Sequence, residues 1–340
     1  MGSLNSRKPR ILRAVLRESR TLKGMDRTGI RTDLGDVLEG VLVVHKEAGW
    51  TSHDVVAKVR SLLRGSKVGH AGTLDPSATG VLPILVGRAT RIAEYLIDWD
   101  KEYHAVMRLG ETTDTQDATG QVLSRVDPGA ITEDMLQAVI TRFRGVQQQL
   151  PPMYSAVKVG GQPLYKAARA GRTVDRAERS IAIHQLEIVA VHGRDVALRI
   201  VCSKGTYIRT LCTDIGQALG VGGHLYALER RRVGPLSIEQ AVTIDQVASH
   251  LTMGTLTRQF MSLDQLLVQL PAVVVNAEQA QRVLNGSPIF PMGVGQLPPA
   301  HSTVSVRLKD EAGQLLAIGT HDASGVGSIR IRKVLSLLSH

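Results

Sequence analysis

The stretch GHAGTLDPSATGVLPILVG, residues 69–87, holds one acidic residue, Asp75, in a turn rich in glycine and threonine that runs directly into apolar sequence. Its apolar end, residues 81–87, predicts a buried strand. An isolated Asp-Pro pair is usually a turn former or a helix cap. The glycines of this stretch let backbone approach a ligand closely, and loops held by strands commonly present catalytic groups. The stretch therefore predicts a carboxylate displayed beside a core strand.

On both sides of this stretch, apolar residues recur at strand and helix spacings without a strict β-α-β alternation. The predicted strands are 40–46, 101–110 and two within 180–205, and the predicted helices are 51–65, 88–100, 132–143 and 206–220. Thr51 or Ser52 is expected to cap the first helix, and Thr206 the last. A hairpin turn is expected at residues 160–161, with a short helix from about Pro163. The fold class is therefore α+β.

The chain divides into four predicted segments. A basic extension, 1–37, precedes a main domain, 38–235, and the composition then shifts. A helical connector is expected over 236–271. Short strands separated by glycine turns around one helix predict a small β-barrel-like module over 272–340.

Positive charge is concentrated at the start of the chain. The net charge is +10, and residues 1–31 hold +7 of it, with nine Lys or Arg against two acids. Because the apolar residues of this segment are scattered, we expect it to be disordered, although its composition leaves an organelle transit peptide open. A net positive charge favours a polyanionic partner. The remaining chain carries only a small excess of charge, so it must bind such a partner through a local patch.

The sequence indicates no metal site and no membrane segment. Cys202 and Cys212 are the only cysteines, and no CxxC pair or His/Cys cluster at metal spacing occurs, so both cysteines are expected to be reduced core residues. No apolar run reaches the roughly 18 residues that a membrane helix needs, and the first residues lack the apolar centre of a secretory signal. We expect a monomeric, cytoplasmic protein.

Four motifs follow one another along residues 38–235: GHAGTLDPSATGVLPILVGRATRIAEYL, KEYHAVMRLGETTDTQDATG, PPMYSAVKVGGQPLYKAARAG and CSKGTYIRTLCTDIGQALG. In this order they resemble the signature of the bacterial tRNA pseudouridine-55 synthase (TruB) family. The resemblance is weaker over the C-terminal module and absent from the first 35 or so residues. It implies a mixed, largely antiparallel sheet flanked by helices, followed by a PUA-like RNA-binding domain. It also implies an enzyme that converts uridine 55 in the T-loop of tRNA to pseudouridine without metal or organic cofactor.

The resemblance gives roles to three residues whose types suit this chemistry. Moving the base from N1 to C5 needs no redox change, and an ionised carboxylate can attack the sugar or base, or take a proton from the sugar. Asp75 matches the family's essential Asp, and Arg209 matches the Arg that pairs with it and would keep it ionised and aimed. Tyr103 matches the Tyr that packs on the target base and is proposed to take the C5 proton. Without the resemblance, such an Arg is more often a surface charge and such a Tyr a core residue.

The same match implies further contacts with RNA. His70 is expected to fill the gap that the flipped base leaves, and Leu228 to cover the base face opposite Tyr103. The other expected contacts are Lys46, Gly72, Thr73, Asp117, Lys158 and Tyr207. The family's Lys-Pro-x-Gly becomes KEAG at residues 46–49, which leaves the geometry of this entrance loop open.

Two readings from other functional classes compete with this one. A glycosidase-like hydrolase would use Asp75 and Asp117 as carboxylates roughly 5 to 9 Å apart, usually with aromatic sugar platforms. An aromatic content of 3% disfavours it. A non-catalytic RNA-binding protein or RNA chaperone is disfavoured by the intact set of Asp75, Tyr103 and Arg209, although chaperoning could accompany catalysis. Within the family, DPSATGVL and the stand-alone ending favour the tRNA enzyme over the RNA-guided relative.

Overall fold

The computed structural model describes residues 38–129, 131–155, 157–172, 174–290, 303–321 and 328–336, without the side chains of residues 158, 163, 165 and 169. The expected basic extension, 1–37, lies outside these ranges. Among the helices within them, none is both long enough and apolar enough to cross a bilayer.

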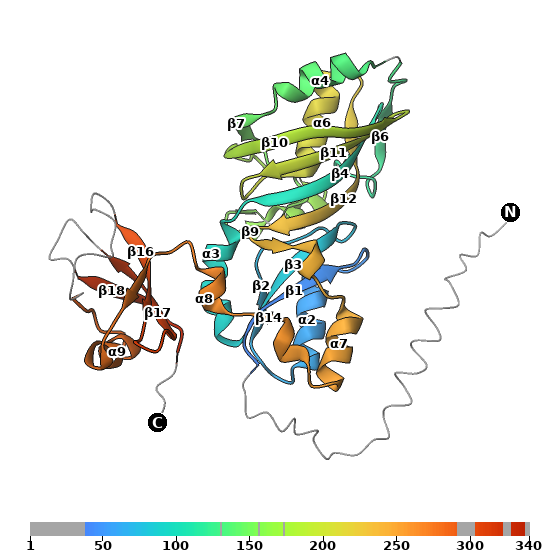
Figure 1. Cartoon of the computed structure of the whole chain (residues 1–340). Coiled ribbons are helices and arrows are strands. Elements are labelled where there is room, and N and C mark those ends of the chain that lie inside the picture. Colours follow the sequence, from blue (N-terminus) through green and yellow to red (C-terminus); the bar gives the residue numbers. More distant parts are fainter. Residues whose placement is uncertain are drawn as a thin grey trace. The chain divides into compact units, whose positions relative to one another are not determined.

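One large sheet organises the residues up to about 260 (Figure 1). Its main path is β14-β1-β3-β12-β4-β11-β10-β7, with β2 beside β3 and β13 beside β12. The strands are β1 (Gly40–Lys46), β2 (Val68–His70), β3 (Thr79–Val86), β4 (Lys101–Leu109), β7 (Gly145–Gln149), β10 (Arg179–His192), β11 (Asp195–Cys202), β12 (Gly223–Val233), β13 (Leu236–Ser237) and β14 (Phe260–Met261). Every pair is antiparallel except β3 with β12. The expected mixed, largely antiparallel sheet is confirmed.

Helices pack on the sheet in two groups (Figure 1). Helices α4 (Glu133–Thr141) and α6 (Ile208–Ala218) pack on the half formed by β12, β4, β11 and β10, and α2 (Ser52–Leu62) and α7 (Ile244–Thr252) pack on the half formed by β1 and β3. The expected helix 88–100 is a 3-10 turn, η2 (Gly87–Ile92), followed by the short α3 (Ala93–Ile97). Each group of helices thus covers its own hydrophobic cluster, and a further cluster joins residues of β1 and β3 to Val233 at the end of β12.

The predicted N-cap is present at α2 but not at α6. At α2, the Thr51 hydroxyl accepts the Asp54 N–H and the Asp54 carboxylate accepts the Thr51 N–H, a reciprocal capping box. The prediction that Thr206 caps α6 is wrong. This helix begins after Tyr207, and the Thr206 hydroxyl instead donates to the carbonyl of Ser203, closing the tight turn before the helix.

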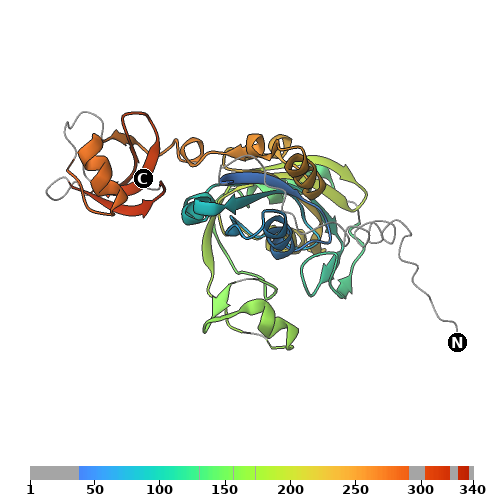
Figure 2. The same cartoon turned by 90° about the horizontal axis from the view of Figure 1, so that it is seen from below.

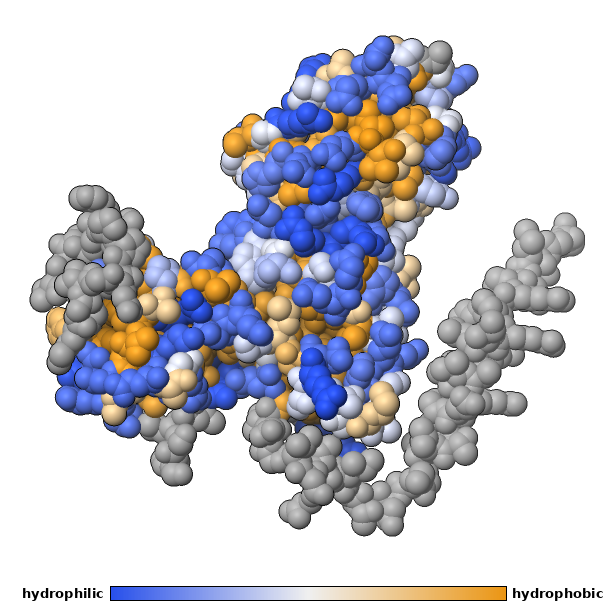
Figure 3. Space-filling model, in the orientation of Figure 1, coloured by the Kyte–Doolittle hydropathy of each residue, from blue (hydrophilic) through white to orange (hydrophobic). Residues whose placement is uncertain are grey.

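Strand β4 shows why one face of the sheet is the core face. Tyr103, Ala105 and Met107 alternate inward into the cluster that includes α4 and α6. The intervening residues, such as His104 and Val106, face the other way and are more exposed. Figure 3 shows hydrophobic and hydrophilic residues intermingled on the surface of this half.

Two hairpins extend from the sheet. β5 (Glu111–Thr113) pairs with β6 (Val122–Arg125), and β8 (Lys158–Val159) pairs with β9 (Gln162–Pro163). The second hairpin turns at residues 160–161 and leads into α5 (Leu164–Arg169), as predicted. In Figure 2 this hairpin and α5, in light green, stand away from the sheet.

The remaining described residues form a connector and a β-rich module. The connector holds η3 (Ile238–Gln240), α7, η4 (Leu256–Gln259) and α8 (Leu263–Leu266), and it also contributes β14 to the large sheet. The module holds β15 (Ala272–Val274), α9 (Ala277–Leu284), β16 (Val304–Lys309), β17 (Leu315–His321) and β18 (Ile329–Val334). Its strands form a separate sheet, β15-β16-β17-β18, over an apolar cluster of its own.

Candidate active site

Asp75 lies in the loop that joins β2 to β3, and neighbouring groups hold this loop in place. The Ala78 N–H donates to the Asp75 carbonyl at 3.1 Å, which closes a turn around the carboxylate. The Ser52 hydroxyl, at the start of α2, accepts the Leu74 N–H at 2.9 Å and donates to the Leu74 carbonyl at 3.2 Å. The first turn of α2 therefore fixes the backbone directly before Asp75.

Lys46 ties the entrance loop to the Asp75 loop. Its ammonium donates to the carbonyls of Glu47, Trp50 and Pro76 at 3.0, 2.7 and 3.2 Å. The residue is fully buried, and burial lowers the pKa of the ammonium to about 8. The structure thus surrounds Lys46, which the resemblance makes an RNA contact, with backbone carbonyls.

Arg209, in the first turn of α6, reaches Asp75 across 134 residues of sequence. Its Nε lies 2.9 Å from Asp75 Oδ2, and its Nη2 lies 3.4 Å from Oδ1. The other N–H groups donate to the carbonyls of Tyr154 at 2.8 Å and Thr115 at 3.1 Å. Only 5% of the Arg209 side chain is exposed. The expected pair is present, and the guanidinium is held in one orientation by both carbonyls.

Asp117 lies on the other side of the same guanidinium. Its Oδ2 is 3.9 Å from Arg209 Nη1. Its Oδ1 accepts hydrogen bonds from the Thr115 hydroxyl at 2.8 Å and from the N–H and hydroxyl of Thr119 at 2.9 and 2.5 Å. Asp117 is buried, so its carboxylate is occupied within its own turn and by Arg209.

The surroundings of Asp75 push its pKa in opposite directions. Burial in the site raises the pKa of this carboxyl, the Arg209 guanidinium lowers it, and the nearby Asp117 carboxylate raises it again. The net pKa lies above the ordinary value, whereas the sequence suggested that Arg209 would dominate. Asp75 nevertheless keeps 38% of its side chain exposed, so it is the accessible carboxylate of the two.

Tyr103 and Leu228 come from the neighbouring strands β4 and β12 and adjoin the same apolar cluster. Tyr103 is buried on the α6 side of the sheet, and Leu228 is half-buried against the same apolar cluster. Burial raises the pKa of the Tyr103 phenol, while a hydrogen bond from Arg230 and the charge of that group oppose the shift. Tyr103 is therefore a neutral phenol in the protein alone.

Arg230 is a part of the site that sequence reasoning missed. It is the first of three successive arginines, a pattern that normally indicates a solvated strand. Register shifts between Leu225 and Ala227 and between Arg230 and Arg232 break the alternation of β12, so the inward position cannot be read from spacing. Arg230 is only 1% exposed, and its guanidinium points into the site.

His70, at the end of β2, stands edge-on to His53 with ring centroids 5.7 Å apart. Burial lowers the pKa of the His70 imidazole, and its Nδ1 is buried without a hydrogen-bond partner among the described residues. Thr73 is exposed, and Gly72 has a φ of +100°, a conformation that favours glycine.

Two further expected RNA contacts lie farther along the chain. Tyr207 precedes α6, where its N–H donates to Gln149 Oε1 at 2.8 Å and its carbonyl accepts Gln149 Nε2 at 3.1 Å. The Lys158 side chain lies outside the described part of the chain.

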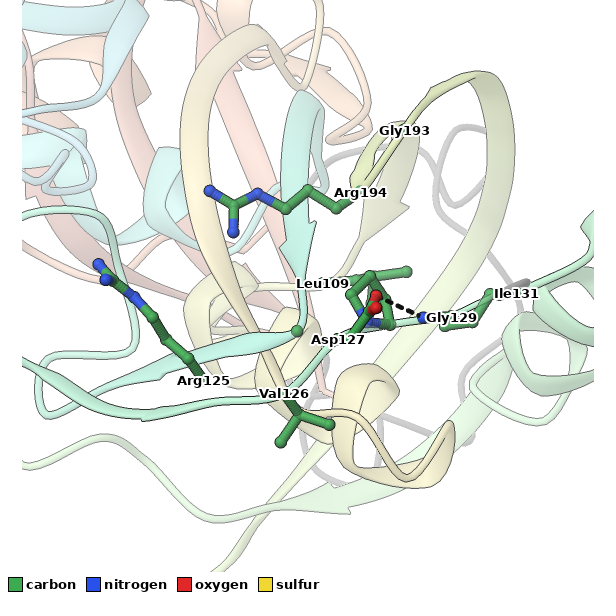
Figure 4. Close-up of a pocket in the computed structure, with 10 residues that line it drawn as sticks. Leu109, Arg125, Val126, Asp127, Gly129, Ile131, Gly193 and Arg194 are labelled. Carbon is green, nitrogen blue, oxygen red and sulfur yellow. Dashed lines mark hydrogen bonds between the residues drawn. The ribbon is translucent and has the colours of Figure 1, made fainter.

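A hollow of about 570 Å³ lies at the end of β4 formed by Leu109 (Figure 4). Arg125 and Arg194 line it, and both interact with Glu111, at 3.0 and 3.8 Å. It begins at Leu109, six residues or about 20 Å along the strand from Tyr103. None of the expected site residues lines it, so it is separate from the Asp75 site.

Comparisons with family models match most of the described chain. The model of the TruB family pseudouridylate synthase N-terminal domain matches residues 60–208, and that of the tRNA pseudouridylate synthase B C-terminal domain matches residues 209–275. The chain is similar to tRNA pseudouridine synthase B of Stutzerimonas stutzeri, at 42% identity over 88% of this chain and 96% of that protein. It is 47% identical to the Ralstonia pickettii protein of the same name, over 73% of this chain and 79% of that one.

Solved structures share the fold at lower sequence identity. A Cbf5-Nop10-Gar1 complex matches with a TM-score of 0.69 and 27% identity, over 88% of this chain and 86% of that chain. An H/ACA RNP bound to a substrate RNA containing 2'-deoxyuridine matches with a TM-score of 0.70 and 26% identity, over 89% of this chain and 87% of that chain. The proteins named tRNA pseudouridine synthase B are thus the nearer in sequence.

Proposed function

This chain belongs to the TruB family of pseudouridylate synthases, and on that premise we propose that it isomerises uridine 55 in the T-loop of tRNA to pseudouridine. Its relatives of 42 to 47% identity are named for tRNA, and a structural neighbour holds a substrate RNA. The substrate class is therefore tRNA, with the T-stem and T-loop as the contacted region.

One observation carries the assignment of Asp75 as the catalytic carboxylate. Of the two acids beside Arg209, Asp75 keeps an exposed edge, whereas Asp117 spends one oxygen on its own turn and turns the other toward the guanidinium. Asp75 can therefore meet a substrate, and Asp117 acts as a positioning residue for Arg209. The same geometry speaks against a glycosidase, since the Asp117 carboxylate is buried and its Oδ1 is hydrogen-bonded within its own turn, which suits it poorly to serve a sugar as the second carboxylate.

The reaction requires the N1–C1′ bond to break, the uracil to rotate, and C5 to bond to C1′. Asp75 begins this either by adding to the sugar or base or by taking a proton from the sugar. Arg209 supports each route, because its fixed fork holds the carboxylate in one direction and stabilises its negative charge. Lys46 and Ser52 keep the loop backbone still while the base moves.

Tyr103 and Leu228 form the walls between which we place the flipped base. The base must leave the stacked T-loop at a cost of a few kcal/mol, and stacking on an aromatic ring offsets part of it. Tyr103 then takes the C5 proton that must leave before the product is aromatic. His70 fills the vacated position in the RNA. Its Nδ1 makes no hydrogen bond among the described residues, so no hydrogen bond at this atom has to break when the ring moves.

The rest of the chain serves RNA binding in this proposal. Residues 38–235 form the catalytic domain, 236–271 the connector, and 272–340 a PUA-like RNA-binding domain, supported by the separate sheet and core of that module. We propose that the enzyme acts as a monomer. We place the enzyme in the cytoplasm, where its tRNA substrate is found.

The test uses unmodified tRNA and a T-stem-loop minihelix, with pseudouridine mapped at single-nucleotide resolution. We expect a single modified position, uridine 55, in both RNAs and none in a tRNA with cytidine there. Asp75→Asn is the matched control, and it should bind tRNA within about tenfold of wild type because phosphate contacts dominate affinity. Modification at another position, or turnover by Asp75→Asn near that of wild type, would overturn the proposal. A protein that only chaperones RNA would produce no pseudouridine in either RNA.

A further inference from the structure

Arg230 has the largest of the fully buried side chains among the described residues, yet no step above uses it. Its guanidinium donates to three backbone carbonyls: Val81 at 2.8 Å from Nε, Gly72 at 2.9 Å from Nη2 and Thr73 at 3.4 Å from Nη1. It also makes a side-chain hydrogen bond with Tyr103. No carboxylate forms an ion pair with it among the described residues. A charge buried without a carboxylate partner is costly, so the position calls for an explanation.

The backbone around Arg230 is fitted to keep this side chain in place. Arg230 pairs with Gly80 in the single parallel contact of the sheet, between β12 and β3. A Cβ at Gly80 would lie 2.2 Å from the Arg230 carbonyl oxygen, so only glycine permits this approach. A Cβ at Gly72 would lie 3.5 Å from Arg230 Nη1. The chain on both sides of Asp75 thus closes around one guanidinium.

This arrangement joins two functional groups that come from different strands. The carbonyls of Gly72 and Thr73 belong to the loop that carries Asp75, and Tyr103 belongs to β4. Arg230 pairs with Tyr103 in the register of β12 and β4, on the same face of the sheet. A single planar group therefore sets the distance between the Asp75 loop and the Tyr103 hydroxyl.

We propose that Arg230 is a positioning residue for Tyr103, which holds the phenol oxygen beside C5 of the target base and stabilises the phenolate while the C5 proton leaves. This inference rests on the proposed function. It adds a residue that acts in the last chemical step, whereas Arg209 acts on Asp75.

The Tyr103 phenol loses its proton to water, and the phenolate oxygen, held by the Arg230 guanidinium, then takes the proton from C5. The C5–H electron pair becomes the C5=C6 double bond, and the C6=N1 pair moves to N1, which takes a proton from water. Tyr103 ends as the phenol with which it began. Negative charge exists on the tyrosine oxygen only during the reaction, where a fixed cationic donor is most effective.

Arginine suits this position better than lysine. Its donors lie in one plane and reach the three carbonyls and the phenol oxygen together, whereas an ammonium would have to give up some of these contacts. Arg230→Lys keeps the charge and removes the fork. We expect single-turnover pseudouridine formation to fall about 10²-fold, the usual effect of losing one preorganised donor to a developing anion.

The decisive experiment compares tRNA with hydrogen or deuterium at C5 of the target uridine. Single-turnover rates are measured with the same enzyme stock in excess, so their ratio does not depend on the folded fraction. We expect the ratio to be larger in Arg230→Lys than in wild type, because removal of the C5 proton becomes slower. Arg232→Lys is the matched control: it lies two residues along the strand, pairs with Glu102 and should leave both rate and ratio unchanged. A lowered rate with a wild-type ratio would overturn the proposal and leave Arg230 a structural role only.

A tRNA with 5-fluorouridine at the target gives a second readout, useful if the variant is nearly inactive on uridine. Its C5 carries no proton, so the glycosidic bond breaks and re-forms without the step assigned to Arg230. Arg230→Lys should lose less activity on this RNA than on uridine, because only its effect on the Asp75 loop remains. An equal loss on uridine and on 5-fluorouridine would overturn the proposal. Wild-type protein that makes no pseudouridine at all would instead reject the proposed function, so the two failures are distinct.

Discussion

Replacing Arg209 by lysine tests the arrangement around Asp75 most directly. The guanidinium donates from Nη2 to Asp75 Oδ1, lies with Nε 2.9 Å from Asp75 Oδ2, and donates to the carbonyls of Tyr154 and Thr115, while Asp117 lies 3.9 Å away. A lysine ammonium has its three N–H groups on one atom, so it cannot reach both Asp75 oxygens and both carbonyls. We expect it to keep one contact with Asp75 and to lose at least two hydrogen bonds of a charged donor.

The size of the effect follows from these contacts. Hydrogen bonds to charged groups contribute about 1.5 to 3 kcal/mol each, so two of them amount to about 3 to 6 kcal/mol. If this loss falls on the transition state, turnover drops by about 10² to 10⁴-fold, since each 1.36 kcal/mol is a factor of ten. Affinity for tRNA should stay within about tenfold of wild type, because phosphate contacts elsewhere supply most of it.

The assay is single-turnover pseudouridine formation on unmodified tRNA, with equilibrium binding measured in the same buffer. Arg199→Lys is the matched control. Arg199 pairs with Glu102 and Glu187 and takes no part in the Asp75 site, so its replacement should change neither quantity. Near wild-type turnover by Arg209→Lys would refute the reasoning that the planar fork aims Asp75. A loss of binding as large as the loss of turnover would refute it as well.

Three further predictions follow from the same structure and sequence. In the proposed reaction Asp75 acts as the ionised carboxylate, so turnover should fall as pH is lowered through its raised pKa. Asp117→Asn removes a like charge and should shift this fall in turnover to lower pH; an unshifted pH profile would contradict the assignment. Gly80→Ala places a Cβ 2.2 Å from a backbone oxygen of β12 at a φ of +105°, so urea denaturation should show a loss of about 2 to 5 kcal/mol in unfolding free energy. An unchanged denaturation midpoint would show that β3 and β12 can move apart at this position without loss of stability. Deleting residues 1–31 should weaken tRNA binding and flatten its salt dependence while leaving turnover at saturating tRNA unchanged, and superimposed binding curves across a salt series would exclude the segment from the RNA site.

The elements that sequence patterns predicted well are those in which one spacing holds from end to end. β4 is the clearest case, because its inward residues alternate without interruption over nine positions. The start of α2 was equally readable, since Thr51 and Asp54 satisfy each other within one turn. The pairing of Asp75 with Arg209 came from family resemblance, because no local pattern links residues so far apart.

What the sequence could not show depends on the meeting of distant strands. The register shifts in β12 place Arg230 inward, whereas Arg231 and Arg232 form ion pairs with Glu239 and Glu102. Three successive arginines in a sequence do not show which of them is buried. The same holds for the pKa of Asp75. A sequence motif can show which charged residues lie near a carboxylate. The loss of hydration that raises the pKa of Asp75 depends instead on how deeply the folded loop buries it.

The parallel contact between β3 and β12 has a consequence for the order in which the protein gains activity. Asp75 belongs to the half built on β1 and β3, and Arg209 to the half built on β4 and β11; between those two halves of the sheet, the strands pair at just two residue positions. Each half has helices packed on its own hydrophobic cluster, and Leu74 and Ala78 of the Asp75 loop join the cluster of the other half only on docking, so each half can acquire helices and strands first. Contacts between residues so distant in sequence close slowly, since a long loop must be ordered first. After dilution from denaturant, circular dichroism should therefore recover ahead of pseudouridine formation, and the delay between them reports the docking of the two halves.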